Sequence, residues 1–425
     1  MDEIEKLYNY FLESTGVCID SRKVIKGVIF FALKGNNSDG NEFAKQAIID
    51  GASLAVIDDK RYQGPNTFLV DNVLTTLQYL AKYHREKLGI PIIGMTGSNG
   101  KTTTKELIKA VLSKKFNVSA TEGNYNNHIG VPLTLLSIGN EAEIAIIEMG
   151  ANHVGEIKFL CELAQPTHGM ITNIGRAHLE GFGSVEGIIK GKGELYNFLI
   201  ATKGVVFVNA QNETLMKLLK GVGNVVRYLS EDSLIKQLSS ESTLKIQDKE
   251  GNVVETQLVG EYNFYNIAAA MCIGDFFGVN NEAINNAISE YLPENNRSQI
   301  IHKSNNTIIL DAYNANPSSM LAALGSFSTK KAYPKIVILG DMFELGEYSA
   351  VEHRSIVEKV LELKLKMALF CGKEFKKVEI NQDGMLFFET KSELEYFLKK
   401  EKLDNVYCLV KGSRGMSLET IIEYL

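Results

Sequence analysis

Short apolar runs alternate with turns and amphipathic stretches in the first part of the chain. Residues 28–33 (VIFFAL) and 54–57 (LAVI) have the length and composition of buried β-strands. Between them, apolar residues recur at the spacing of one helix face, at Phe43, Ala44, Ala47 and Ile48. A longer helix is predicted over residues 74–88, and it leads out of this first zone.

The alternation continues through the rest of the chain. In a second zone, strands are predicted at residues 90–95, 144–147, 169–172 and 205–208. In a third zone, they are predicted at residues 307–310, 335–339, 367–370 and 406–410. Apolar strands separated by amphipathic helices indicate parallel sheets that are covered on both faces. A hairpin-like insert is predicted over residues 243–258, with its turn at 249–252.

The length of the chain requires more than one core. It has 425 residues, whereas a domain usually contains about 100–200 residues. We therefore predict an α/β protein of three domains: a small N-terminal α/β domain (1–88), a central parallel-sheet domain (89–297) and a C-terminal Rossmann-like α/β domain (298–425). The second boundary follows the turn-rich segment 292–296.

Composition narrows the class of protein. The formal net charge of −6 argues against a general nucleic-acid binder. The five cysteines are far apart and include no C-x-x-C pair, which favours reduced core thiols over disulfides or a zinc site. The N-terminus, MDEIEKLYNYF, is acidic and lacks the apolar region of a signal peptide. We therefore expect a cytoplasmic protein without membrane insertion, and we expect a monomer.

A glycine-rich loop is the strongest local signal. Residues 94–104, GMTGSNGKTTT, follow a predicted strand and precede a predicted helix, as in a P-loop. Gly97 and Gly100 allow the backbone to wrap around phosphate oxygens, and the helix N-terminus adds N–H donors. Lys101 can reach the β- and γ-phosphates, and the Thr102 hydroxyl can ligate Mg²⁺. Met95 stands where the strict G-x-x-x-x-G-K-[ST] pattern has its first glycine.

Two further polar residues follow strands that are predicted to lie in the same sheet. Glu148 ends an apolar run, and a carboxylate there can hold Mg²⁺ against ATP. His178 also follows a strand and is a candidate ligand for a second cation, although a lone histidine is more often structural. For Glu180, an acidic residue at the start of a helix explains the sequence equally well.

The loop and four other segments together resemble one family, the Mur ligases. The form T-G-x-x-G-K-T-T is the one that Mur ligases and folylpolyglutamate synthases use. The other segments are 122–132 (EGNYNNHIGVP), 147–151 (IEMGA), 173–180 (NIGRAHLE, followed by Gly183 and Ser184) and 311–320 (DAYNANPSSM). Their order and spacing extend the resemblance over nearly the whole chain.

The resemblance implies an ATP- and Mg²⁺-dependent ligase of peptidoglycan precursor synthesis. The expected reaction joins D-alanyl-D-alanine to UDP-N-acetylmuramoyl-tripeptide through an acyl phosphate. The N-terminal domain would bind the UDP part, the central domain ATP, and the C-terminal domain the dipeptide. The loop 339–346 (LGDMFELG), together with His353, is similar to a C-terminal loop that faces the dipeptide.

The resemblance also implies a modified lysine. Related ligases carry a carbamylated lysine four residues before an aromatic residue, which here is Lys192 before Tyr196. Carbamylation replaces an ammonium by a carboxylate-like group that can bind Mg²⁺. Lys190 is the alternative position, and a solvated helix lysine is the unmodified alternative.

The metal ligands expected by sequence are Thr102, Glu148, His178 and Lys192, and the expected catalytic residues are Lys101, His178, Lys192 and Arg297.

The expected nucleotide contacts lie on both sides of the second domain boundary. In the P-loop they are Gly97, Ser98, Asn99, Gly100, Lys101, Thr102 and Thr103. Residues 260–266 (GEYNFYN) resemble the family's G-x-H-N-x-x-N, which implies an adenine contact at Asn266, although Tyr262 stands in place of the histidine. Arg297 resembles an arginine that reaches the ATP phosphates, which its fork of donors suits. Asp311 is expected near the ribose and Asn314 in the same cleft.

The expected contacts with the UDP-linked substrate come from two regions. In the first domain, the resemblance implies Ser21, Arg22, Lys34 and Asp39, of which Arg22 and Lys34 can balance a diphosphate. In the second domain, it implies Asn126, Asn127 and Ser184, near the muramoyl part. For the charged residues, ordinary surface positions remain the alternative.

Two other functions remain open at this point. A folylpolyglutamate synthase has the same loop and chemistry but lacks a UDP-binding first domain. A non-catalytic nucleotide-binding partner of a ligase would not need Lys101, Thr102, Glu148, His178 and Arg297 together.

Overall fold

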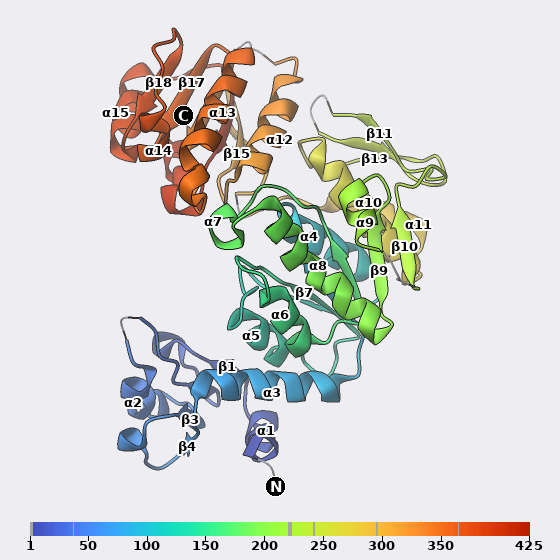
Figure 1. The fold of residues 1–425 in the computed structure, drawn as a ribbon, viewed down its shortest axis with the longest axis vertical. Helices are drawn as coiled ribbons and strands as arrows, with labels where there is room; N and C mark the ends of the chain where they lie inside the picture. The colour runs from blue at the N-terminus through green and yellow to red at the C-terminus, as the bar shows by residue number, and fades with distance from the viewer. Residues whose placement is uncertain are drawn as a thin grey trace.

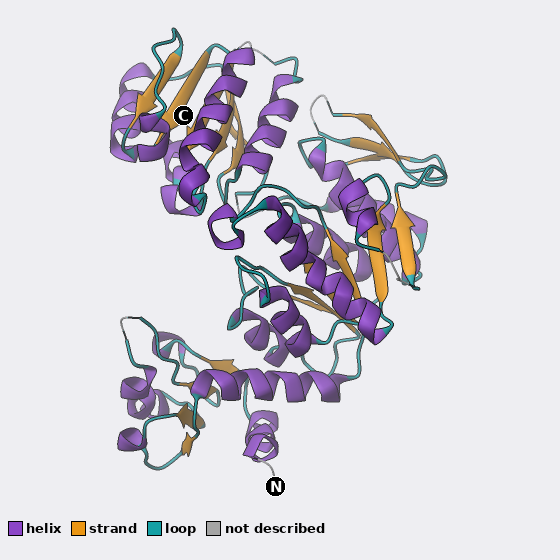
Figure 2. Cartoon of the chain, viewed as in Figure 1, coloured by secondary structure: helices purple, strands orange, loops and turns teal. Residues whose placement is uncertain are grey.

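The computed structural model describes residues 3–36, 38–219, 223–240, 243–294, 296–332, 334–363 and 365–425. Within these ranges the chain forms three α/β units in sequence order, from the N-terminal unit at the bottom of Figure 1 to the C-terminal unit at the top. Figure 2 shows helices against the sheets in each unit. The predicted fold class, a three-domain α/β protein, is confirmed.

The N-terminal unit is built on a four-stranded parallel sheet with the order β1-β2-β3-β4. Its strands are β1 (Val17–Cys18), β2 (Ile29–Phe31), β3 (Leu54–Ile57) and β4 (Thr67–Leu69). Its helices are α1 (Glu3–Glu13), α2 (Ala44–Ile49) and α3 (Val73–Leu88), with short 3₁₀ turns at Ser21–Lys23, Gly40–Phe43 and Lys60–Tyr62. The predicted strand 54–57 and helix 74–88 are found almost as expected.

Helix α3 joins this unit to the next one. Two residues near its C-terminus are buried and bond to main-chain oxygens of the middle unit. Arg85 donates from Nε to Ala164 O at 2.9 Å and from Nη2 to Gln165 O at 3.1 Å. His84 Nε2 lies 2.9 Å from Ile138 O. The guanidinium therefore satisfies free carbonyl groups at the end of a middle-domain helix, and this helix end is held against α3.

The middle unit contains a six-stranded parallel sheet with the order β10-β9-β8-β5-β7-β6. Its strands are β5 (Ile92–Thr96), β6 (Val118–Ala120), β7 (Ile144–Glu148), β8 (His168–Ile171), β9 (Val205–Asn209) and β10 (Val225–Tyr228). Its helices are α4 (Lys101–Leu112), α5 (Gly130–Leu136), α6 (Glu156–Ala164), α7 (Leu179–Phe182), α8 (Val185–Thr202), α9 (Glu213–Lys217), α10 (Tyr262–Phe276) and α11 (Asn281–Glu290). β5 and β7 are buried along their whole length, as parallel strands covered on both faces must be.

The order of these strands positions the site. β5 lies between β7 and β8, so the loops that follow these three strands meet at one edge of the sheet. Ligands of open α/β sheets bind outside the carboxyl ends of the strands. The P-loop after β5 therefore has Glu148 on one side and residues 172–175 on the other.

The predicted hairpin insert is also present. The strands β11 (Lys236–Ser239), β12 (Lys245–Gln247) and β13 (Val253–Glu255) form an antiparallel sheet beside α10 and α11. The buried Asp248 side chain closes the turn by accepting hydrogen bonds from the Asn252 main chain at 2.7 Å and from the Asn281 amide at 2.6 Å. These bonds attach the hairpin to α11.

The C-terminal unit is a second doubly covered sheet, with the order β14-β15-β19-β16-β17-β18. Its strands are β14 (Gln299–Lys303), β15 (Asn306–Asp311), β16 (Lys335–Gly340), β17 (Met367–Cys371), β18 (Met385–Phe388) and β19 (Tyr407–Lys411). Its helices are α12 (Pro317–Ser328), α13 (Ser349–Glu362), α14 (Lys373–Lys377) and α15 (Lys391–Glu401). β14 was not predicted: it is an antiparallel edge strand with little buried surface, so it lacks the apolar run of the inner strands.

No helix within the described ranges combines the length and the apolar character that crossing a membrane requires.

Candidate active site

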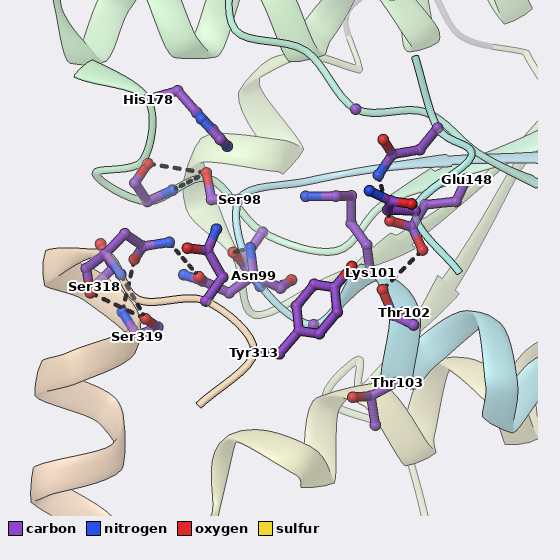
Figure 3. A pocket seen from close by; sticks show the side chains of 18 of the residues that line it. Ser98, Asn99, Lys101, Thr102, Thr103, Glu148, His178, Tyr313, Ser318 and Ser319 are labelled. Carbon is purple, nitrogen blue, oxygen red and sulfur yellow. Dashed lines mark hydrogen bonds between the residues drawn. The ribbon is translucent and has the colours of Figure 1, made fainter. Parts of the chain in front are cut away.

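A cleft of about 840 Å³ opens between the middle and C-terminal units. It is lined by the P-loop, by residues after β7 and β8, by the N-terminus of α10, by the loop after β15 and by Lys411 at the end of β19. Figure 3 shows Lys101, Thr102 and Glu148 at this cleft, with Ser318 and Ser319 of α12 facing Asn99.

The P-loop adopts its shape through two glycines with positive φ. Gly97 (φ 148°) approaches Thr172 so closely that a Cβ would lie 1.9 Å from its hydroxyl. At Gly100 (φ 77°), an added Cβ would lie 2.7 Å from Asn266 Oδ1. Any larger residue is excluded at both positions, because an L side chain disfavours this backbone conformation and meets a neighbour. Asn266 of α10 therefore lies against the phosphate loop.

Lys101 is the first residue of α4, and it folds back over the loop. Its Nζ donates to Gly97 O at 2.7 Å. Enclosure by surrounding atoms lowers the pKa of Lys101, while nearby Glu148 opposes this shift. Lys101 makes no ion pair in the described part of the chain, and its charge is available to a phosphate.

Glu148 connects the P-loop with the asparagine-rich loop 122–132. Its side chain is almost completely buried, and Oε2 accepts a hydrogen bond from the Thr102 hydroxyl at 3.0 Å. Oε1 accepts one from the Asn126 amide at 2.9 Å. The carboxylate, which was predicted as a metal ligand, thus lies beside the predicted threonine ligand. Asn126 was predicted to contact substrate, and here it orients Glu148.

His178 lies at the interface with the C-terminal unit. It has a left-handed backbone (φ 55°), and its Nδ1 lies in close contact with the Glu344 carboxylate. Contact with His178 lowers the pKa of the Glu344 carboxyl. A second pair, from Arg176 Nη1 to Glu352 Oε1 at 2.8 Å, joins the same two units. His178 lines the cleft, but no group of three or more His, Cys, Asp and Glu residues in the described ranges is arranged to hold a metal ion.

Lys192 is an unusual buried lysine. It lies in α8 with 0% of its surface exposed, and its Nζ has no hydrogen-bond partner among the described residues. The Nζ lies 5.4 Å from the centre of the Phe182 ring. Burial, with a smaller effect of nearby Lys101, lowers the pKa of Lys192 well below its usual value. An unpaired buried ammonium is costly, and burial therefore favours the neutral amine. Lys190, by contrast, is exposed.

The C-terminal side of the cleft carries Arg297, Asp311 and Asn314, as predicted. The Arg297 guanidinium stacks on the Tyr313 ring at 3.7 Å from its centre, and its Nε has no hydrogen-bond partner among the described residues. Asn316 Nδ2 donates to Asn99 Oδ1 at 2.7 Å, so the C-terminal unit touches the P-loop directly.

Most of the predicted site residues therefore come together, and some do not. The lining includes the predicted residues Ser98, Asn99, Gly100, Lys101, Thr102, Thr103, Asn126, Asn127, Glu148, His178, Asn266, Arg297, Asp311 and Asn314. Lys192 is buried behind this surface, and Ser184 caps α8 by accepting a hydrogen bond from Gly187 N at 3.1 Å.

The four predicted residues of the first domain do not line this cleft. Arg22 pairs with Asp20 at 2.8 Å, and Lys34 pairs with Asp58 at 2.8 Å. Asp39 caps a 3₁₀ turn by accepting a hydrogen bond from Asn41 N, and Ser21 begins another such turn. These contacts are local, and they leave the predicted UDP contacts untested.

Several lining residues were not predicted. Tyr313, Ser318 and Ser319 lie inside the segment 311–320 that was singled out, but no role was given to them. Lys411 lay outside every motif, although its position at the end of a strand is the same signal that identified Glu148. Tyr262, which departs from the family motif, also lines the cleft.

Comparison with known proteins agrees with this arrangement. Three family descriptions match: "Mur ligase family, catalytic domain" at residues 13–93, "Mur ligase middle domain" at 95–274 and "Mur ligase, glutamate ligase domain" at 296–414. The UDP-N-acetylmuramoyl-tripeptide--D-alanyl-D-alanine ligase of Bacillus subtilis is 35% identical, over 96% of this chain and 93% of that protein. The ligase of the same name from Escherichia coli is 32% identical, over 96% and 93%.

Solved structures are similar over the same length. MurF from Acinetobacter baumannii superposes with a TM-score of 0.88 at 28% identity, covering 99% of this chain and 97% of that one. MurF ligase from Thermotoga maritima in complex with ADP gives 0.85 at 26% identity, with 97% of each chain covered. Because the three family descriptions follow one another over most of the chain, and relatives 35% and 32% identical cover 96% of it, the chain belongs to the Mur ligase family.

Proposed function

We propose that this protein joins D-alanyl-D-alanine to UDP-N-acetylmuramoyl-tripeptide at the expense of ATP. The observation that carries the proposal is the shared position of Glu148, to which Thr102 of the P-loop and Asn126 of the loop 122–132 both bond. The phosphate site and the loop expected to face the muramoyl peptide therefore meet at one carboxylate. The two related ligases described above are named for this activity. Their similarity to this chain extends over nearly its full length.

The reaction proceeds by acyl activation. A carboxylate oxygen of the tripeptide attacks the γ-phosphorus of ATP, and ADP leaves with the electron pair of the broken P–O bond. The dipeptide amine then attacks the acyl carbon, and phosphate leaves while the amine loses a proton. Lys101 and Arg297 stabilise negative charge on the transferred phosphoryl group. This chain needs no covalent nucleophile for either step.

The residues present fit a Mg²⁺ ion near the P-loop. Thr102 and Glu148 supply hard oxygen donors side by side, which is the type of ligand that Mg²⁺ prefers. His178 and a carbamylated Lys192 would complete a second position. When bound, the ion neutralises charge on the β- and γ-phosphates. Glu148 also fixes Asn126, so metal binding and the substrate loop depend on the same side chain.

Replacing Glu148 with glutamine is expected to raise the Mg²⁺ concentration needed for half-maximal binding of a fluorescent ATP analogue by about tenfold or more, because a neutral amide ligates a hard cation less well. A Mg²⁺ titration with fluorescence detection measures this. The matched control is Glu141→Gln, which changes an exposed acid in the same domain. Equal Mg²⁺ dependence in the wild type and Glu148→Gln would contradict the metal assignment.

Lys192 is the proposed site of carbamylation. Only a neutral amine reacts with CO₂, and burial lowers the pKa of Lys192, which favours that form. The carbamate forms a C–N bond and releases one proton, which yields an anion in place of an ammonium. Its two oxygens would extend beyond the unpartnered Nζ and supply hard donors for a cation. The neighbouring Lys101 favours this anion by its positive charge.

The site is completed by movement of the C-terminal domain. Lys101 and Thr102 belong to the middle domain, whereas Arg297 lies at the proposed boundary and Asp311 and Asn314 lie beyond it. Interdomain surfaces are mobile unless they are large and apolar, and the contacts seen here, from Arg176 to Glu352 and from Asn316 to Asn99, are polar. We propose that the free enzyme also samples an open form, in which Arg297 lies far from the P-loop.

Small-angle scattering tests this movement. Addition of an ATP analogue and UDP-muramoyl tripeptide is expected to lower the radius of gyration, because only the compact form makes both sets of contacts. The analogue alone should have a smaller effect. The proposal is wrong if the radius is unchanged and the free crystal form already places Arg297 on the phosphate site.

Other assignments complete the proposal. The domains are 1–88, 89–297 and 298–425, and the first binds the UDP part through Ser21, Arg22, Lys34 and Asp39. Asn127 and Ser184 face the muramoyl part. We further propose that the protein is a monomer in the cytoplasm, where its nucleotide substrates are.

A phosphate-release assay tests the function. ATP, UDP-muramoyl tripeptide and D-alanyl-D-alanine together should give phosphate and a pentapeptide product detectable by mass spectrometry. Omission of any one should abolish both. Phosphate release with a folate and glutamate instead would favour the folylpolyglutamate synthase alternative. Nucleotide binding without turnover on either set would favour a non-catalytic partner.

A further inference from the structure

We propose that Lys411 is a positioning residue for the nucleotide, because it holds the Asp311 carboxylate and the loop of Asn314 in one orientation. The inference rests on the proposed function in one respect, namely that Asp311 and Asn314 contact ATP. It concerns a residue outside all the sequence motifs.

Lys411 is buried and binds two groups at the edge of the cleft. The side chain is 2% exposed and lies at the end of β19. Its Nζ donates to Asp311 Oδ2 at 2.6 Å and to Asn314 O at 3.2 Å. Asp311 and Lys411 are direct partners in the register of β15 and β19, so their side chains leave the sheet at the same edge. An anionic partner stabilises the charge of a lysine this deeply buried, and Asp311 supplies it.

The second oxygen of Asp311 is held from the domain boundary. Oδ1 accepts a hydrogen bond from Ser298 N at 3.3 Å. Ser298 has a left-handed backbone (φ 50°), and its hydroxyl shares a hydrogen bond of 2.8 Å with the Tyr262 hydroxyl. Tyr262 belongs to α10 of the middle domain. Lys411 therefore fixes one side of the carboxylate, and the connection between the domains fixes the other.

Loss of the Lys411 side chain would remove the hydrogen bonds that hold Asp311 Oδ2 and the Asn314 carbonyl. Without the ammonium, Asp311 turns toward water or toward Ser298, and the Asn314 carbonyl loses its donor. Binding depends on contacts that are oriented before the ligand arrives, because each side chain that must be ordered on binding lowers affinity. The structure offers no reason for a matching loss in affinity for the UDP-linked substrate, whose proposed contacts lie on other elements.

The test is a double-mutant cycle on the full-length protein, with the dissociation constant of a fluorescent ATP analogue as the readout. Lys411→Met is expected to raise this constant about tenfold, which corresponds to about 1.4 kcal/mol. Lys411→Arg, which keeps the charge, should recover most of the affinity. In an Asp311→Asn background, Lys411→Met should have little further effect, because coupled residues are not additive. The KM for UDP-muramoyl tripeptide should stay within about twofold of the wild-type value.

Lys335→Met is the matched control. Lys335 is also buried in the C-terminal domain, but its Nζ donates to Ser328 O, and it does not line the cleft. It should lower the thermal midpoint without changing nucleotide affinity. A loss of affinity in Lys335→Met equal to that in Lys411→Met would show a general packing effect and overturn the inference.

Three further outcomes separate the inference from the proposed function. If Asp311→Asn weakens ATP binding but Lys411→Met does not, or if their effects add, the positioning role is wrong and the nucleotide role of Asp311 stands. If Asp311→Asn leaves binding unchanged, the nucleotide role itself is wrong, and the inference falls with it. If the cycle behaves as expected but the wild type does not ligate D-alanyl-D-alanine, only the proposed reaction is wrong.

Discussion

Replacing Lys101 with alanine is expected to lower kcat for ligation by about 10³-fold, while the protein remains folded. Lys101 provides a positive charge at the P-loop, and its hydrogen bond to Gly97 O is one that water can replace. The charge matters most when the phosphoryl group is in transit, because negative charge then spreads over its oxygens. Phosphate release under saturating substrates gives kcat, and circular dichroism with thermal unfolding reports the fold.

Lys109→Ala is the matched control for Lys101. It removes an exposed lysine from the same helix, α4, and should leave kcat unchanged. A second variant, Lys101→Arg, keeps the charge but not the shape of the ammonium, and should recover only part of the activity. Near-normal kcat in Lys101→Ala would mean that residues 94–104 are not the catalytic phosphate loop.

Replacing Lys192 with alanine is expected to lower kcat by about 10²-fold or more, which is the size of loss that removal of one preorganised electrostatic contact to a reacting group causes. Its physical basis is the carbamate, which supplies an anion where the unmodified side chain has only an amine without a hydrogen-bond partner among the described residues. Short carboxylic acids such as acetate should restore part of the activity, because they can occupy the cavity that the variant leaves. The assay measures phosphate release with and without added acid.

Lys190→Ala is the control, since Lys190 is exposed two residues away on the same helix. It should be fully active and insensitive to added acid. Mass spectrometry of a tryptic digest does not preserve carbamates, so labelling with ¹³C-bicarbonate and NMR provides the direct measurement: one carbamate signal in the wild type and none in Lys192→Ala. An active Lys192→Ala variant, with no labelled signal in the wild type, would refute the modification.

The sequence predicted most accurately the features that depend on local periodicity and local backbone geometry. The apolar runs identified the inner strands, such as β3 and β7, because burial on both faces of a parallel sheet leaves no polar alternation. The P-loop was recognisable because its glycines, lysine and threonine act through neighbouring backbone. The edge strand β14 was missed, since partial exposure removes the apolar signal.

For the cleft, the sequence predicted many of the residues that line it. It did not predict which of these residues bond to one another. Asn126 was assigned to substrate, and the structure shows it bonded to Glu148. Lys192 was singled out by its spacing from Tyr196, yet nothing in the sequence distinguishes a lysine with 0% exposure from Lys190 on the surface. These differences depend on which side of a helix or loop faces another segment.

By itself, the sequence therefore determined the α/β class, the phosphate loop and the family, since these depend on periodicity, local backbone requirements and motif order. Only the tertiary structure decided that β5 lies between β7 and β8, which brings Glu148 and Thr172 to the two sides of the P-loop. It alone paired Lys411 with Asp311, which are 100 residues apart. The reason is physical: strand order and domain packing are set by the burial of many apolar side chains together, and no short segment encodes them.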